Sequence, residues 1–148
     1  MVQEEYMELA LALAAEAAAE GEVPVGCVVV DAAGTVIGRG RNRRERSHDA
    51  TAHAEMEAIR QACAQMGDWR LEGCSLYVTL EPCPMCTGAI INARIPRLVY
   101  GAREENYGSC GSVIDLFFER YGHRPQVYGG VRGEESASLL RDFFKNKR

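Results

Sequence analysis

No stretch of the sequence limits the fold more than SLYVTLEPCPMC, which spans residues 75–86. Its apolar and β-branched first half predicts a buried strand. Pro84 then suits the first position of a helix, where its missing N–H group is not needed. Cys83 and Cys86 lie three residues apart at this predicted helix start, so both thiols can face one ion. The chain must therefore pass from a strand directly into a helix that carries two candidate metal ligands.

Helical and strand patterns alternate through the rest of the chain. Ala, Leu and Glu dominate residues 3–20, and Gly21 follows where a helix would end, so we expect a first helix there. CVVVD and TVIGRG are separated by AAG and predict a hairpin. The remaining expectations are helices over residues 54–66, 112–120 and 134–145, a helix after Pro84, a strand over 97–102, a short strand or extended segment over 125–130, and a polar loop over 41–49. This order predicts an α/β fold with a mixed sheet of about five strands and helices on both faces.

The length and composition fit an ordinary globular domain. The chain has 148 residues, of which 47% are hydrophobic and 26% charged, so it can bury one sizeable core. We expect a single domain over residues 1–148. No run approaches the roughly 18 uninterrupted apolar residues of a membrane span, and the opening MVQEEY is acidic where a signal peptide would be basic. The expected location is therefore the cytoplasm, with no membrane partner.

Six cysteines are spread through the predicted regular structure. In a reducing compartment such cysteines are buried thiols or metal ligands more often than disulfides. Only Cys83 and Cys86 have the spacing of metal ligands. We expect the other four to be small core residues, namely Cys27, Cys63, Cys74 and Cys110.

The formal charge of −4 is unevenly distributed along the chain. Residues 1–22 contain six glutamates and no lysine or arginine, so the remaining residues carry a net charge of +2. Within that remainder, residues 39–46 hold five arginines and residues 141–148 hold four basic residues. Such segments are suited to contacts with nucleic acid, but arginine-rich loops are also common on solvated surfaces. The charge pattern alone leaves both interpretations open.

His53 stands in DATAHAEMEAI, upstream of the cysteine pair. One imidazole and two thiolates form a soft set of three ligands that suits zinc. Three protein ligands leave the fourth tetrahedral position to water, as in catalytic sites, whereas a structural site fills it with a fourth residue. The alternatives are a redox-active cysteine pair, a structural zinc site with a distant fourth ligand, and a histidine that only stabilises the fold.

HAE followed by PCPMC matches the signature of zinc-dependent nucleobase deaminases, in which the glutamate moves protons and does not bind the metal. Glu55 is the acid in that position. In mid-helix, His53 and Glu55 would point about 200° apart. We therefore expect the pair at a helix entry, where both side chains can face one water molecule. Since Cys83 and Cys86 also start a helix, the site would lie between two helix N-termini, whose positive ends favour a thiolate.

The sequence also resembles bacterial tRNA adenosine deaminases, the TadA family, over nearly its whole length. The similar stretches occur in the family's order: GEVPVGCVVV, RNRRERSHDATAHAE, WRLEGCSLYVTLEPCPMCTGAI, RLVYGARE and SLLRDFFKNKR. The short motifs are shared with cytosine, cytidine and guanine deaminases. The long block from WRLEG to CTGAI and the EVPVG segment favour the tRNA enzymes.

The resemblance implies hydrolytic deamination of the wobble adenosine in a tRNA anticodon loop to inosine, with release of ammonia. It implies a three-layer α/β/α cytidine-deaminase-like fold, which usually forms a homodimer through the helix at residues 85–93. It also implies one zinc ion per subunit, bound by His53, Cys83 and Cys86, with Glu55 as the catalytic residue.

Matching positions extend the resemblance to substrate binding. Asn42 would hydrogen-bond the flipped base or its sugar, while Val25 and the backbone near Ala54 would line the base pocket. The anticodon loop is single-stranded, so its adenosine can be turned out at a lower unstacking cost than in a duplex. The candidate RNA contacts are Arg41, Arg43, Arg44, Glu104, Phe144 and Lys145. Glu104 and Asn106 stand where the family commonly has Asp and Lys.

Two other functions remain open from the sequence. The same zinc centre could deaminate a free base or nucleoside, such as guanine or cytosine, without RNA contacts. A zinc-binding interaction module without catalysis is the alternative from another class. This last alternative requires a metal that water cannot reach.

Overall fold

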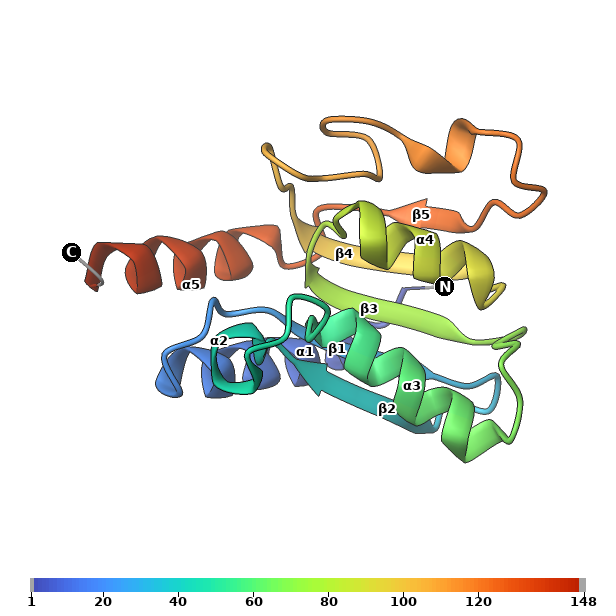
Figure 1. Ribbon diagram of the computed structural model, residues 1–148, viewed down its shortest axis with the longest axis horizontal. Helices are drawn as coiled ribbons and strands as arrows, with labels where there is room; N and C mark the ends of the chain where they lie inside the picture. The colour runs from blue at the N-terminus through green and yellow to red at the C-terminus, as the bar shows by residue number, and fades with distance from the viewer. Residues whose placement is uncertain (1, 147–148) are drawn as a thin grey trace.

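The computed structural model describes residues 2–146, and helices and strands alternate along this range as the sequence predicts (Figure 1). The elements are, in chain order, α1 (Glu4–Ala19), β1 (Gly26–Val30), β2 (Val36–Arg41), α2 (Arg44–Ser47), α3 (Ala54–Met66), β3 (Ser75–Leu80), α4 (Pro84–Asn92), β4 (Arg97–Ala102), the 3₁₀ helix η1 (Leu116–Phe118), β5 (Gln126–Tyr128) and α5 (Gly133–Asn146). None of the described helices is long and apolar enough to cross a membrane.

The strands form one mixed sheet in the order β2-β1-β3-β4-β5. β1 pairs antiparallel with both β2 and β3, as the predicted hairpin requires. β3, β4 and β5 run parallel, and α4 makes the crossover between the first two of them. The carboxyl ends of parallel strands lie at the same edge of the sheet. The segments that follow β3 and β4 therefore lie side by side there.

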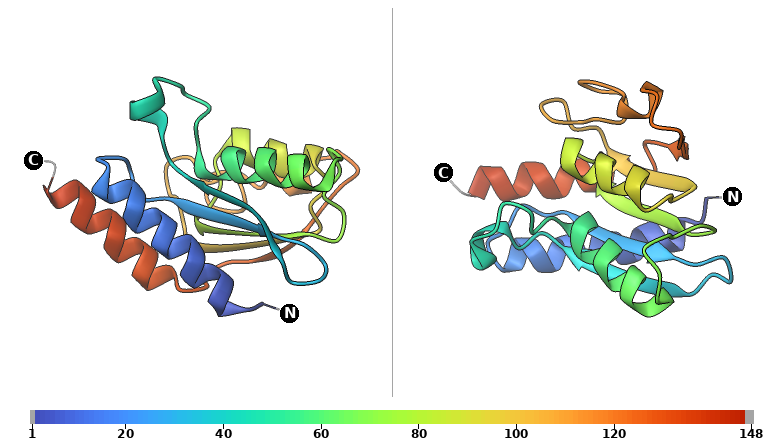
Figure 2. Two further views of the ribbon diagram at one scale, coloured as in Figure 1. Left: turned by 90° about the horizontal axis from the view of Figure 1, so that it is seen from below. Right: turned by 45° about the vertical axis from the view of Figure 1, so that its right-hand side comes forward.

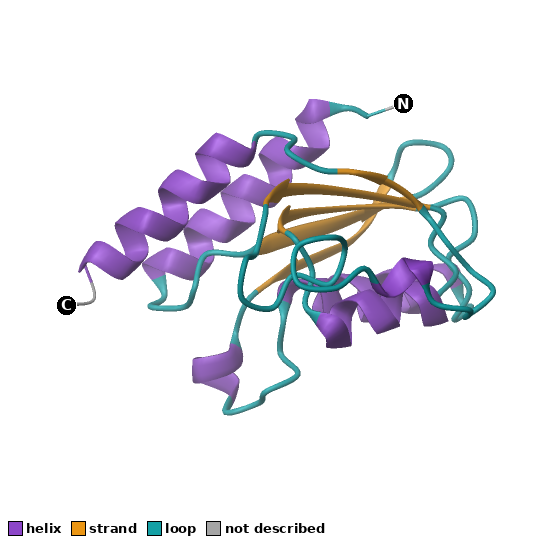
Figure 3. Cartoon of the chain, turned by 90° about the horizontal axis from the view of Figure 1, so that it is seen from above, coloured by secondary structure: helices purple, strands orange, loops and turns teal. Residues whose placement is uncertain are grey.

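Helices cover both faces of the sheet. α3 and α4 lie on one face, and α1 and α5 lie side by side on the other (Figures 2 and 3). The expected three-layer α/β/α arrangement is confirmed. One apolar cluster, which includes Leu76, Ile90 and Leu98, fills the space under α3 and α4. A second cluster, which includes Met7 and Val99, lies between the sheet and α1.

Two glycines of β2 let α3 approach the sheet closely. A Cβ atom at Gly38 would lie 2.2 Å from the carbonyl oxygen of Ala58, and one at Gly40 would lie 2.1 Å from that of Ala54. No side chain fits into these distances, so glycine is required at both positions. The close packing fixes the start of α3, and His53 is the residue directly before it.

Side chains of α3 also cover the outer edge of the sheet, which β2 forms. The backbone N–H of Arg39 donates to Gln61 Oε1 at 2.8 Å, and that of Arg41 donates to Glu57 Oε1 at 3.3 Å. These donors would otherwise point to solvent at an edge strand. The helix therefore satisfies the hydrogen-bonding groups of its neighbouring strand as well as packing on it.

Three local expectations were wrong. The predicted helix over 112–120 is only the 3₁₀ turn η1, in which the Asp115 carboxylate accepts a hydrogen bond from Phe117 N at 3.1 Å and the backbone becomes extended again at Glu119. The polar loop over 41–49 contains the one-turn helix α2. Cys63 is only partly buried, whereas the other three non-motif cysteines are in the core.

Candidate active site

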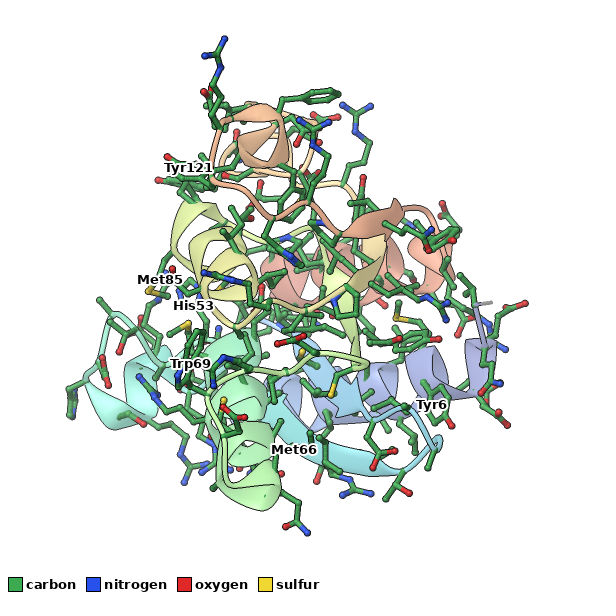
Figure 4. All side chains as sticks on the ribbon, turned by 90° about the vertical axis from the view of Figure 1, so that its right-hand side faces the viewer. Tyr6, His53, Met66, Trp69, Met85 and Tyr121 are labelled. Atoms are coloured by element: carbon green, nitrogen blue, oxygen red, sulfur yellow. The ribbon has the colours of Figure 1, made fainter. Side chains whose placement is uncertain are left out.

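A cavity of about 560 Å³ lies where β3 ends and where α3 and α4 begin. Its lining combines titratable, polar and apolar side chains from all parts of the chain: Val23, Val25, Asn42, Arg44, His53, Ala54, Glu55, Leu80, Glu81, Cys83, Pro84, Met85, Glu104, Asn106, Tyr107 and Phe144. Figure 4 shows His53 and Met85 next to each other where the two helices start. A cavity of this size with a few converging polar groups is the usual form of a small-molecule site.

His53, Cys83 and Cys86 come together at one end of this cavity. His53 and Cys83 are the N-cap residues of α3 and α4, and Cys86 lies in the first turn of α4. His53 Nδ1 is 3.6 Å from Cys83 Sγ and 3.5 Å from Cys86 Sγ. Tetrahedral coordination with ordinary zinc bond lengths would place such atoms about 3.6 Å apart. The three side chains therefore fit a zinc ion in both ligand type and spacing.

The two thiols differ in their affinity for protons. A hydrogen bond from Cys86 lowers the pKa of Cys83 to about 4, although partial burial opposes the shift. The same hydrogen bond, together with burial, raises the pKa of Cys86 well above its ordinary value. The pair thus favours a thiolate at Cys83, and a bound metal ion would displace the proton of Cys86 as well. The thiolate is stabilised at the start of α4, where a helix dipole also favours negative charge.

Glu55 is a buried carboxyl group beside these ligands. It is the second residue of α3 and only 4% of its surface is exposed. Burial raises its pKa to about 7, so the group is poised to gain or lose a proton near neutral pH. His53 precedes the helix with an extended backbone (φ −85°, ψ 153°), which places the pair at a helix entry, as their spacing predicts.

The three predicted substrate-binding residues all line the cavity. Val25 and Ala54 contribute apolar wall, and Asn42 contributes a nearly buried amide. Asn42 Nδ2 donates to Val23 O at 3.3 Å, and its Oδ1 accepts from Arg44 N at 3.1 Å. An amide side chain has two N–H groups and two lone pairs on its oxygen, so one donor and one acceptor of Asn42 remain for another group.

The three predicted arginine contacts have different surroundings. Arg41 Nε forms an ion pair with Glu20 Oε1 at 2.9 Å, and Arg43 Nε lies 3.1 Å from Glu57 Oε2. Arg44 lines the cavity, and the acid nearest to it is its exposed neighbour Glu45 at 4.0 Å. Only Arg44 of these three therefore presents its charge to the cavity.

The remaining predicted contacts lie in two other segments. Glu104 and Phe144 line the cavity, whereas Lys145 lies in the last turn of α5 outside the cavity lining. The final two residues of the basic segment 141–148 fall outside the described residues.

Sequence reasoning assigned no site role to several residues of the lining. Glu81, Tyr107, Met85, Leu80 and Val23 all line the cavity. Glu81 stands two residues before Cys83, so the motif itself gave a signal. Tyr107 lies in a polar loop, where only the fold brings it to the site.

Comparison of the sequence with known proteins identifies the family of this chain. The sequence profile of the cytidine and deoxycytidylate deaminase zinc-binding region matches residues 1–102. The chain belongs to this deaminase family. Within the family, it is 45% identical to the tRNA-specific adenosine deaminase of Bacillus subtilis, over 100% of this chain and 92% of that protein. The expected resemblance to the TadA family is confirmed.

Other known proteins are also similar to this chain in sequence or structure. A tRNA(Ile)-lysidine synthase of Deinococcus deserti is 51% identical over 94% of this chain, which spans only 26% of that longer protein. A solved structure from work on A-to-I editing by tRNA:A34 deaminases superposes with a TM-score of 0.89 at 47% identity, covering 93% of this chain and 100% of that one. A guanine deaminase from Nitrosomonas europaea gives a TM-score of 0.83 at 25% identity, covering 96% and 84%.

Proposed function

We propose that this deaminase converts the wobble adenosine of a tRNA anticodon loop to inosine by hydrolysis, releasing ammonia. The observation that carries the proposal is the buried Glu55 beside a zinc-type ligand set in one cavity. The names of the full-length relatives support the tRNA substrate. The whole chain would act as one deaminase domain in the cytoplasm.

One zinc ion per chain would be held by Nδ1 of His53 and the thiolates of Cys83 and Cys86. When bound there, zinc would supply the Lewis acidity that brings the pKa of a water molecule towards neutrality. The positive ends of α3 and α4 both point to this position and favour the negative charges of the reaction. No further protein ligand is needed, so water can reach the centre from the cavity.

Glu55 would move the protons. It would accept one proton from the attacking water and pass it to N1 of the adenine as the C6–O bond forms. It would then take the remaining proton of the added hydroxyl group and deliver it to the exocyclic amine, so that the C6–N bond breaks and ammonia leaves. The overall reaction adds one water to adenosine and gives inosine and ammonia. A carboxyl group with a pKa of about 7 suits this task, because it both accepts and donates protons readily at neutral pH.

The cavity walls would bind the nucleotide. The free donor and acceptor of Asn42 are available to the base or its sugar, and Val25 and Ala54 would contact the flat faces of the ring. Arg44 is suited to a backbone phosphate, and Phe144 to stacking with an unpaired base. Lys145 and Glu104 would contact neighbouring parts of the loop, while Arg41 and Arg43 would reach RNA only if their acid partners release them.

A homodimer is part of the proposal. Two large apolar side chains, Met66 and Trp69, are exposed near α3 and α4, and Figure 4 shows them on the side that also carries the half-buried Met85. Met66 is 44% exposed and Trp69 is 52% exposed, and side chains of this kind favour burial against a partner. We expect this surface, together with the neighbouring helix α4, to contribute to contact with a second copy. Sedimentation analysis that finds only monomers at micromolar concentration would contradict this part.

The rival function is deamination of a free purine base. The structural similarity to guanine deaminase favours it, since that enzyme shares the fold over 96% of this chain. Arg44 and the loop with Tyr107 argue for a larger substrate, because they extend the cavity beyond the space around the ligand set.

One assay separates the two functions. The zinc-loaded protein is incubated with an anticodon stem-loop that bears a wobble adenosine and, separately, with free guanine, while inosine and ammonia are measured. We expect inosine in the stem-loop and no turnover of guanine. Ammonia from guanine together with an unchanged stem-loop would overturn the proposal in favour of the rival.

A further inference from the structure

The cavity has a second wall, which is built by the loop that follows β4. Glu104, Asn106 and Tyr107 of this loop line the same cavity as His53 and Glu55. The match to the deaminase profile ends at residue 102, so the loop lies outside the matched region. The loop has no regular secondary structure between residues 103 and 109, and its shape must be held by side chains.

Glu81 supplies those contacts through one buried carboxylate, which is only 2% exposed. Its Oε2 accepts hydrogen bonds from the backbone N–H groups of Cys110 at 3.0 Å and Ser112 at 3.1 Å. Its Oε1 accepts from the backbone N–H of Glu104 at 3.2 Å and from the hydroxyl of Ser112. The four bonds join both ends of the loop to a single side chain, and bonds to an ionised acceptor are stronger than neutral ones.

The loop is packed tightly against this carboxylate. A Cβ atom at Gly108 would lie 2.6 Å from Glu81 Cδ and Oε2 and 2.3 Å from the carbonyl oxygen of Glu104. Ser109 N donates to Pro82 O at 2.9 Å, so the same segment is also bound to the backbone beside Glu81. The loop therefore closes over the carboxylate with no room for a side chain at Gly108.

We propose that Glu81 is a positioning residue for substrate binding. Its carboxylate holds the loop of residues 104–112 as a fixed wall of the cavity, so that Asn106 and Tyr107 meet the nucleotide without first being ordered. Fixing a loop before binding removes an entropic cost that the substrate would otherwise bear. Glu81 takes no part in proton transfer, which stays with Glu55. This inference depends on the proposed function in one respect only, which is the identity of the bound nucleotide.

The first test is the variant Glu81→Gln. The amide has the same size, but its NH₂ group would face backbone donors, so about half of the hydrogen bonds are replaced by repulsive contacts. We expect KM for the anticodon stem-loop to rise about tenfold or more, because buried donors are left unpaired. We expect kcat and the zinc content of the purified protein to stay close to those of the wild type.

Two further variants show how large an effect on KM to attribute to Glu81. Ser112→Ala removes the hydroxyl bond and keeps the backbone bond, so KM should rise in the same direction by a smaller factor. Glu105→Gln is the matched control, because Glu105 is an exposed acid in the same loop and does not line the cavity. This control removes one negative charge without touching Glu81, and its KM should equal that of the wild type.

Amide hydrogen exchange tests the contact without any substrate. In Glu81→Gln, exchange at Cys110 and Ser112 should become faster, while exchange in β3 and β4 stays protected. A wild-type protein that fails to deaminate the stem-loop would overturn the proposed function, and this exchange measurement would still decide whether Glu81 holds the loop.

Three results would overturn the inference. An unchanged KM in Glu81→Gln would show that the loop does not depend on this carboxylate for binding. A fall in kcat at unchanged KM, or a loss of zinc, would place Glu81 in the catalytic centre instead. Unchanged exchange at Cys110 and Ser112 would show that other contacts hold the loop.

Discussion

The two walls of the cavity are built in opposite ways. On the metal side, Glu55 and Cys86 are buried and sit in the first turns of α3 and α4. On the loop side, Tyr107 is 67% exposed and belongs to a segment without regular structure. Helix ends fix atoms to within a fraction of an ångström, which proton transfer needs, whereas loops tolerate change. The molecule thus separates a chemical wall fixed by helix ends from a recognition wall that side-chain contacts to Glu81 hold in place.

The largest loss of activity is expected from a change on the metal side of the cavity alone. Glu55→Ala should lower kcat by about 10²–10⁴-fold, because a positioned proton carrier contributes a factor of this size. Zinc should remain at the wild-type level, since the ligand set does not include Glu55. Stopped assays of inosine formation and metal analysis of the same sample measure both quantities.

Glu55→Gln is the companion variant, because it preserves the volume of the side chain and cannot carry a proton. It should lose about as much activity as the alanine variant. Full activity in either variant would show that Glu55 does not carry the protons. It would also contradict the assignment of chemistry to one wall and recognition to the other.

A smaller effect is expected when the loop side is changed. Tyr107→Ala should raise KM for the stem-loop by about tenfold at unchanged kcat, because stacking of an aromatic ring on a base contributes ~1–3 kcal/mol. Steady-state kinetics over a range of stem-loop concentrations measure the two constants separately.

Tyr107→Phe distinguishes the ring from the hydroxyl. It keeps the stacking surface and should behave like the wild type. If the phenylalanine variant binds as poorly as the alanine variant, the hydroxyl is the important group and stacking is not the explanation.

The smallest effect concerns the arginines beside the cavity. Replacing Arg44 with Gln should reduce the slope of log KM against log salt concentration by about 0.7, the contribution of one phosphate contact to a single strand. Arg41→Gln should leave the slope unchanged, because Arg41 is paired with Glu20 at 2.9 Å. Equal slopes for the two variants would contradict the different roles that the structure gives them.

The metal side was predictable from sequence because its information is local. The strand over 75–80 and the helix over 54–66 were predicted with the bounds that the structure has. Each candidate ligand lies next to a recognisable helix start, and the spacing of Cys83 and Cys86 carries the geometry within four residues. The expectation that His53 and Glu55 share a helix entry follows from the same local rule.

The loop side could not be predicted because its contacts join distant parts of the chain. Glu81 reaches residues up to 31 positions away, and nothing local marks them as partners. The ion pair between Arg41 and Glu20 is likewise a tertiary contact, so a charged loop that seems available in sequence is partly neutralised in the fold. The false helix over 112–120 has a local origin instead, since Asp115 caps a single turn there and the backbone is extended again at Glu119.

The covered edge of the sheet has a consequence for how the protein can assemble. With the N–H groups of Arg39 and Arg41 already bound by Gln61 and Glu57, β2 offers no row of free donors to the strand of a second molecule. Continuous cross-chain sheets, the usual start of fibril growth, are therefore blocked at this edge. At this edge, copies of the chain can associate only through side chains, so a contact there would leave the hydrogen bonds of the sheet as they are.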